Sequence, residues 1–112
     1  MNDKISFEEF QKVEMLSGTI VDAQNNEKAK KPAYVLKIDF GERGVKMSSA
    51  QITDSYSLED LIGKQVVAVC NFPEKIIAGV KSEVLVLGVY SKNNGVVLLE
   101  PTFKVENGSL IG

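Results

Sequence analysis

The 112-residue sequence has no histidine, no tryptophan and a single cysteine, Cys70. Without histidine neither a Ser-His-Asp triad nor a Cys-His pair can form, and a zinc site loses both its imidazole ligands and a second thiolate. The adjacent carboxylates, Glu8 with Glu9 and Glu59 with Asp60, fall in short helical patterns whose faces we expect to be solvated. We therefore predict no catalytic residue, no metal site and no cofactor, and hence a protein that is not an enzyme.

One cysteine cannot form an internal disulfide, and secreted domains of this size usually contain several, so the sequence favours a reducing cytoplasm. Cys70 follows Val69 in an apolar run, and we expect a buried, inert thiol because the chain has no histidine to act as its base. The apolar runs are far too short to span a membrane, and the first residues, MNDKISFEEF, do not resemble a signal peptide. The predicted location is cytoplasmic, without membrane insertion.

The composition is that of a folded domain, with 44% hydrophobic and 25% charged residues. A chain of this length buries roughly two-thirds of the surface that its unfolded form exposes, so neither a disulfide nor a metal is needed for stability. We expect one domain over residues 1–112, with an N-terminal helical extension (1–14), a barrel (15–100) and a C-terminal extension (101–112).

The first predicted element is a short helix with a defined start. Ser6 and Glu9 form a capping box, and Ile5 and Phe10 stand at the positions of a hydrophobic staple. Phe7 and Phe10 would share one face of this helix, which must then pack against something. It either closes an end of its own barrel or packs on a second subunit, and the sequence leaves both alternatives open.

Strand patterns begin at residue 15. We expect strands over 15–23, with Gly18 at a bulge or sharp bend, and over 33–40 and 45–52, with a polar loop at 24–32. Alternation in the second strand predicts that Tyr34, Leu36, Ile38 and Phe40 point to the core.

The second half of the chain adds one helix and further strands. Ser57 and Asp60 cap a short helix that ends at Gly63. The expected later elements are a buried central strand (66–72), a loop (73–81), a strand (82–90), a turn with an Asn-Gly signal (92–95) and a returning strand (96–100).

This order, with a helix between the third and fourth strands, is the connectivity of the OB-fold, an all-β, five-stranded barrel. Such barrels bind oligonucleotides on strands two and three and with the loops between strands one and two and strands four and five. The prediction is an OB-fold barrel with short helices, whose N- and C-terminal extensions form a homodimer.

Charge is unevenly distributed along the chain despite a net charge of only −2. Residues 1–27 contain two lysines and six acidic residues, whereas residues 28–46 contain five lysines and Arg43 against two acidic residues. Lys75 and Lys81 add positive charge to the later loop, so both binding loops of an OB barrel carry lysines that could contact phosphates. A solvated charged face without a ligand is the alternative interpretation.

Three strings resemble the tRNA-binding domain family: Lys46-Met47-Ser48-Ser49-Ala50-Gln51-Ile52, Val69-Cys70-Asn71-Phe72-Pro73-Glu74-Lys75-Ile76, and Val80 through Gly88. Phe7-Glu8-Glu9-Phe10-Gln11-Lys12-Val13 and Lys31-Pro32-Ala33-Tyr34 are closer still to its CsaA-like branch. The resemblance covers nearly the whole chain in the same order. Val84-Leu85 stands where many members have Gly-Met, which also favours the CsaA-like branch.

The resemblance implies an OB-fold homodimer that binds tRNA or structured RNA and has a chaperone role linked to protein export. The alternative is a chaperone for unfolded or export-bound polypeptides whose RNA binding is weak or incidental. Charge and resemblance together give the expected RNA-binding residues Lys30, Lys31, Lys37, Lys46, Ser49, Gln51, Asn71, Lys75, Lys81, Ser82 and Leu85. Purely structural roles are the alternative: Ser48, Ser49 and Gln51 could satisfy buried backbone groups at an irregular strand. Glu83, which is not in the expected RNA-binding set, could pair with a nearby lysine.

A dimer interface is the last expectation. Phe7, Phe10, Leu110 and Ile111 make the two end segments more apolar than free ends usually are.

Overall fold

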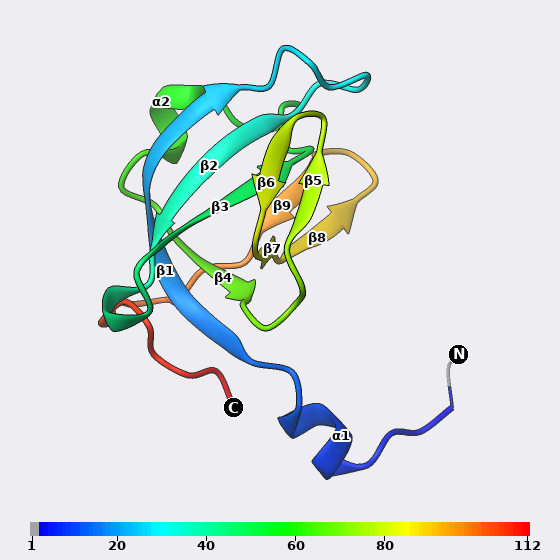
Figure 1. Cartoon of the computed structure of the whole chain (residues 1–112), viewed down its shortest axis with the longest axis vertical. Helices are drawn as coiled ribbons and strands as arrows, with labels where there is room; N and C mark the ends of the chain where they lie inside the picture. Colours follow the sequence, from blue (N-terminus) through cyan, green and yellow to red (C-terminus); the bar gives the residue numbers. More distant parts are fainter. Residues whose placement is uncertain (1–2) are drawn as a thin grey trace.

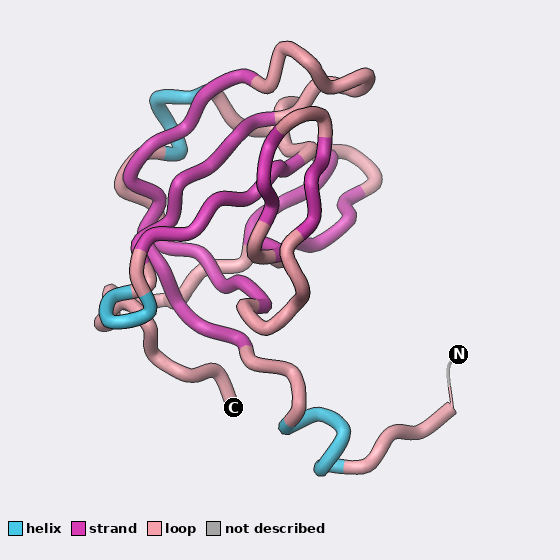
Figure 2. Tube along the Cα trace, in the orientation of Figure 1, coloured by secondary structure: helices cyan, strands magenta, loops and turns pink. Residues whose placement is uncertain are grey.

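Strands dominate the structure, and five of them form one antiparallel sheet that curls into a nearly closed barrel (Figure 1 and Figure 2). The computed structural model describes residues 3–112. The strand order is β3-β2-β1-β4-β7, comprising β1 (Met15–Asn25), β2 (Tyr34–Asp39), β3 (Val45–Ala50), β4 (Gln65–Val69) and β7 (Leu85–Val86). The helix α2 (Leu58–Leu61) lies between β3 and β4 in the chain, so the predicted OB connectivity is confirmed.

The barrel is completed where the segment after the later hairpin meets the outer edge of β3. The Glu83 backbone N–H donates to the Met47 carbonyl (2.8 Å), and the Glu83 carboxylate accepts from the Met47 N–H (3.0 Å). The Ser82 hydroxyl oxygen accepts from the Ser49 N–H (3.3 Å). Glu83 thus bonds to backbone, and no lysine within residues 3–112 pairs with it, contrary to the ion pair that the sequence offered as an alternative. Edge groups of β3 that would otherwise be open to another strand are thereby occupied.

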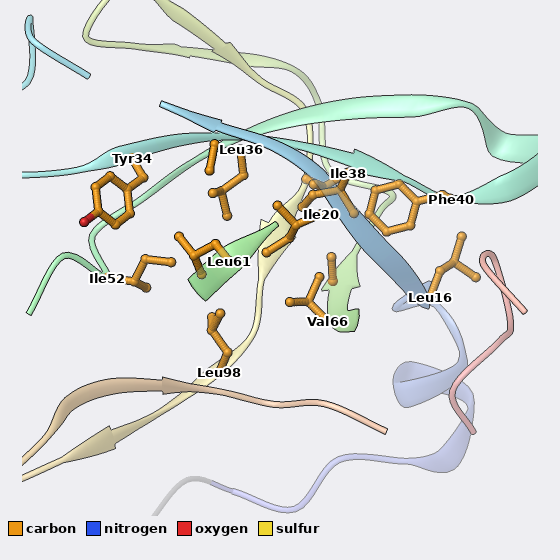
Figure 3. Packing of buried hydrophobic residues seen from close by; sticks show 13 residues of the cluster. Leu16, Ile20, Tyr34, Leu36, Ile38, Phe40, Ile52, Leu61, Val66 and Leu98 are labelled. Atoms are coloured by element: carbon orange, nitrogen blue, oxygen red, sulfur yellow. The ribbon is translucent and has the colours of Figure 1, made fainter. Parts of the chain in front are cut away.

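The core lies inside the barrel and follows the alternation expected for β2. Leu36, Ile38 and Phe40 are fully buried, and Figure 3 shows them pointing toward side chains from the other strands and from α2. Gly18 is required by this packing, because a Cβ there would lie 2.7 Å from both Ile38 Cγ2 and Phe40 Cε1. Of the bulge or sharp bend expected at Gly18, the bulge is wrong: Gly18 pairs regularly with Val66, and the register of β1 against β2 shifts between Ile20 and Asp22.

Residues 73–81, expected to be a loop, instead form much of a small hairpin. β5 (Lys75–Ile77) pairs with β6 (Val80–Ser82), and the turn between them holds both Ala78 (φ 49°) and Gly79 (φ 79°) in the left-handed region. Two positive φ angles are the requirement of a type I′ turn. In Figure 1 this hairpin stands in front of β3.

The expected strand at 82–90 is also divided. β7 is followed by a separate strand, β8 (Gly88–Ser91), which pairs with β9 (Gly95–Leu98) across the predicted Asn-Gly turn. Because β8 and β9 form their own two-stranded sheet, the barrel sheet ends at β7.

The N-terminal helix α1 (Phe7–Gln11) has the predicted capping box, since Ser6 Oγ accepts from Glu9 N–H and the Glu9 carboxylate accepts from Ser6 N–H. None of its residues is buried, and Phe7 is 70% exposed. Figure 1 shows α1 projecting from the start of β1, away from the sheet. The alternative in which this helix closes its own barrel is therefore wrong.

The segment that follows β9 returns to the first strand. Ser17 N–H donates to the Ser109 carbonyl (2.9 Å), Gly108 N–H donates to the Ser17 carbonyl (2.7 Å), and Leu110 bridges Leu16. The Gln65 side chain bonds both the N–H and the carbonyl of Val105. The first half of β1 consequently has β4 on one side and this segment on the other.

The remaining helices are single turns. The capping box of α2 is present as predicted, and hydrogen bonds from the Ser57 side chain and backbone hold the pKa of Asp60 below its ordinary value. A 3-10 turn, η1 (Gly41–Arg43), connects β2 to β3. None of the helices in residues 3–112 has the length and apolarity needed to span a bilayer.

Candidate nucleic-acid interface

The lysine-bearing loop before β2 lies against the tip of the β5–β6 hairpin. The Lys28 side chain passes over the turn, with its Cδ 3.1 Å from the position of a Cβ built on Gly79. Lys30 and Lys31 in the same loop are exposed, as is Lys37 on the outer face of β2. Two segments about 50 residues apart in sequence therefore carry positive charge to one side of the molecule.

A pocket of about 430 Å³ opens beside the hairpin, and its walls are mainly apolar. It is lined by Ser49, Phe72, Pro73, Glu74, Lys75, Ile77, Ser82, Glu83, Val84 and Leu85. Four of the predicted RNA-binding residues, Ser49, Lys75, Ser82 and Leu85, are thus brought together from β3, β5, β6 and β7. Their function in RNA binding stays a prediction.

The two hairpin lysines differ in their surroundings. Lys81 Nζ lies 3.2 Å from a carboxylate oxygen of Glu74, and both side chains are more than half exposed. Such a pair contributes little to stability, about 0–1 kcal/mol. Lys75 is exposed, and no acidic group within residues 3–112 lies within ion-pair distance of it. The charge of Lys75 is the one left unneutralised at the pocket.

Asn71 has a structural use of its own. Its amide nitrogen donates to the Lys12 carbonyl (2.6 Å), and its amide oxygen accepts from the Glu14 N–H (2.9 Å). These two bonds fasten the chain between α1 and β1 to the end of β4. Contact between Asn71 and RNA would have to accommodate that arrangement.

Lys46 and Gln51 stand apart from the pocket. Lys46 lies opposite the buried Ile38 where β2 and β3 pair. Because neighbouring residues of a strand point to opposite faces, Lys46 is on the other face of the sheet from Met47, which is on the outer face. Its charge acts on Cys70, where it slightly opposes a raised pKa. Gln51 follows the end of β3 and is exposed. The structure therefore separates Lys46 from Lys37, although both were predicted to contact RNA.

Cys70 follows β4 and is half-buried, so its thiol is less enclosed than the buried thiol that the sequence predicted. Burial, reinforced by the negative charge of Glu14, raises the pKa of its thiol from the ordinary 9.0 to about 11. The thiol is thus protonated at neutral pH, which fits the expected inert cysteine. Arg43, at the other side of this corner, forms an ion pair with Glu14.

The remaining pocket residues were absent from the predicted set, namely Phe72, Pro73, Glu74, Ile77, Glu83 and Val84. Phe72 is 53% exposed, and its place at the mouth of a lysine-bearing segment was the available signal. Ile77 and Glu83 offered no signal, because the hairpin that positions them was not predicted. Within residues 3–112 there is no group of three Asp, Glu or Cys side chains arranged to hold a metal ion.

Comparison with known proteins gives consistent matches. The family described as a putative tRNA binding domain matches residues 15–110. The crystal structure of chaperone CsaA from Bacillus anthracis is 50% identical with a TM-score of 0.93, covering 98% of this chain and all of that one. CsaA chaperone protein from Picrophilus torridus is 45% identical with a TM-score of 0.92, covering 97% of this chain and all of that one.

Curated relatives are longer proteins. Methionine–tRNA ligase from Methanococcoides burtonii is 34% identical over 109 residues, which are 97% of this chain but 16% of the ligase. Matches to other methionine–tRNA ligases likewise span 14–17% of their length. The likeness to these ligases is therefore confined to one segment of each, while the family match and the CsaA structures extend over nearly all of this chain. The chain belongs to the putative tRNA binding domain family.

Proposed function

We propose that this protein binds tRNA or a similarly structured RNA through the surface formed by the 26–33 loop, the outer face of β2 and the β5–β6 hairpin. The observation that carries the proposal is the family match over residues 15–110, together with the gathering of lysines on this surface. Phosphates would be neutralised by exposed lysines from three separate segments, namely Lys30, Lys31, Lys37, Lys75 and Lys81. Ser49 and Ser82 would bond sugars or base edges. Neither catalysis nor a cofactor is part of this function, and its place is the cytoplasm.

Filter binding with total bacterial tRNA at several salt concentrations tests the proposal. We expect binding at low salt that falls steeply as salt rises, because lysine–phosphate contacts release counterions. Lys75→Ala should weaken binding and reduce the slope of log K against log salt by about 1. Lys104→Ala, which removes the same charge from an exposed position in the segment after β9, is the matched control and should leave the slope unchanged. Absence of wild-type binding at low salt contradicts the proposal.

A chaperone role for unfolded or export-bound polypeptides is the second candidate. It is favoured by the similarity to two structures named as CsaA chaperones and by apolar side chains left on the surface, among them Ile76 (74% exposed) and Leu85 (50%). Micromolar protein should then slow the aggregation of a chemically unfolded client, and Ile76→Ser should reduce this effect. A client that aggregates at the same rate with and without the protein rules this candidate out.

We further propose that the working unit is a homodimer assembled through α1 and the segment after β9. Phe7 and Leu110 are about 70% exposed, and Phe7 and Phe10 form a ring pair (6.1 Å between centroids) on a helix with no buried residue. A second copy would cover these apolar side chains, with Ile111 beside them. Sedimentation should show a dimer at micromolar concentration and a shift toward monomer in Phe7→Ser. A wild-type monomer would refute the assembly.

A further inference from the structure

The pocket beside the β5–β6 hairpin combines mainly apolar walls with a smaller set of polar groups, here called its rim. Phe72, Ile77 and Leu85 provide apolar surface from three different segments, and each of them is partly exposed to solvent. The uncharged polar groups come from Ser49 and Ser82, and the charged ones from Glu74, Lys75 and Glu83. At about 430 Å³, the pocket falls within the range of roughly 300–1,000 Å³ that small-ligand sites occupy.

The polar groups at the rim retain capacity for further hydrogen bonds. Ser82 Oγ accepts from the Ser49 N–H, which leaves its own O–H to donate. One carboxylate oxygen of Glu83 accepts from Met47 N–H, while the other has no partner within residues 3–112. The Ser49 hydroxyl is likewise without a partner among these residues. The pocket therefore presents both donors and acceptors beside an aromatic ring.

We infer that this pocket holds one unpaired nucleobase of the bound RNA, with the base stacked on Phe72 and its edge facing Ser49, Ser82 and Glu83. This inference rests on the proposed function and adds to it the part of the RNA that enters the protein. A base has flat apolar faces and an edge of donors and acceptors, the two features that the pocket supplies. Lys75 lines the same pocket and provides the charge for the phosphate of that nucleotide.

A nucleobase fits these observations better than a polypeptide does. An apolar peptide side chain would leave the polar rim without partners and would bring a carboxylate into contact with apolar surface. An extended peptide usually adds to an open strand edge, but the Met47 and Ser49 amides of β3 are already taken by Glu83 and Ser82. Peptide binding is thus an outcome that the experiment must distinguish.

The test compares the wild-type protein with Phe72→Leu, Phe72→Tyr and Phe103→Leu. Phe72→Leu keeps an apolar side chain but removes the ring, Phe72→Tyr keeps the ring, and Phe103→Leu makes the same change at an 81% exposed position outside the pocket. The probes are total tRNA, a short oligoadenylate and a strand of abasic sites with the same number of phosphates. Affinity is measured by fluorescence anisotropy at several salt concentrations, and circular dichroism checks that each variant is folded.

We expect Phe72→Leu to weaken binding of tRNA and oligoadenylate on the order of tenfold, with no change in the salt slope, because stacking is lost and phosphate contacts are kept. The abasic strand should bind the wild-type protein and Phe72→Leu alike. Phe72→Tyr and Phe103→Leu should stay within about twofold of wild-type affinity.

The inference is overturned if Phe72→Leu binds tRNA as tightly as wild type while Lys75→Ala binds it weakly; the proposed function then survives without the base pocket. It is overturned as well if the wild-type protein binds oligoadenylate and the abasic strand equally. If Phe72→Leu no longer binds an apolar peptide that the wild-type protein binds, while its RNA binding is unchanged, the pocket is assigned to polypeptides instead. Failure of wild-type protein to bind tRNA at low salt removes the proposed function and this inference together.

Discussion

Replacing Glu83 by alanine should weaken the contact between the segment after the β5–β6 hairpin and β3 without breaking it. The Glu83 carboxylate is the acceptor for the Met47 N–H, and the alanine variant leaves that partly buried donor without its partner. Hydrogen bonds to charged groups contribute about 1.5–3 kcal/mol. Because Glu83 is only half-buried and its own backbone N–H still bonds the Met47 carbonyl, we expect a loss of about 1–2 kcal/mol.

Differential scanning calorimetry should show this loss as a decrease in Tm of roughly 3–8 °C, given the size of the domain. Glu83→Gln keeps an amide oxygen as acceptor and should lose less than half as much. Hydrogen exchange adds a local readout: the Met47 amide should exchange faster in Glu83→Ala, while the Leu36 amide in the neighbouring strand changes little. If Glu83→Ala melts within about 1 °C of wild type and Met47 keeps its protection, the side chain does not hold the barrel closed.

Two further predictions concern the core and the cysteine. Gly18→Ala should reduce the free energy of unfolding by about 1–3 kcal/mol in urea titration, because the new Cβ meets Ile38 and Phe40 at 2.7 Å. Gly112→Ala, whose Cβ meets nothing within 4 Å, is the control. Equal stability of the two variants would contradict the close packing at Gly18. With its pKa raised to about 11, Cys70 should react with a disulfide reagent at pH 8 on the order of 100-fold more slowly in the native protein than in urea. Equal reaction rates in the native and urea-unfolded protein would refute this raised pKa. The stabilisation linked to the protonated thiol is fully present below the ordinary pKa of 9.0 and is lost as pH rises toward 11.

The parts of the fold that could be predicted are those encoded by local chemistry. The capping boxes at Ser6 and Ser57 require only residues three apart, and both are present. The inward stripe of β2 follows from alternation, which is clear wherever one face of a strand is buried. The order of the elements then limited the topology to one familiar barrel.

The β5–β6 hairpin was missed for an equally local reason. All three residues of β5 are exposed, so its side chains show no alternation, and its turn has Ala78 at a position where Asn, Asp or Gly usually signals a type I′ turn. The pocket depends on this hairpin, and the partners that Glu83 and Asn71 find lie 36 and 57 residues away in sequence. Contacts between residues so far apart in sequence are determined by tertiary packing, and no local sequence pattern indicates them.

The return of residues 105–111 to β1 has a consequence for the order in which the protein assembles. Ser17 bonds partners 89 and 92 residues further along the chain, so the start of β1 lacks its neighbour on that side until residues 105–111 have been synthesised. Until then the start of β1 presents unpaired backbone groups, a template for pairing with other chains. Contacts so distant in sequence slow folding, because a long loop must close before they form. The start of β1 is therefore open to misassembly until residues 105–111 become available.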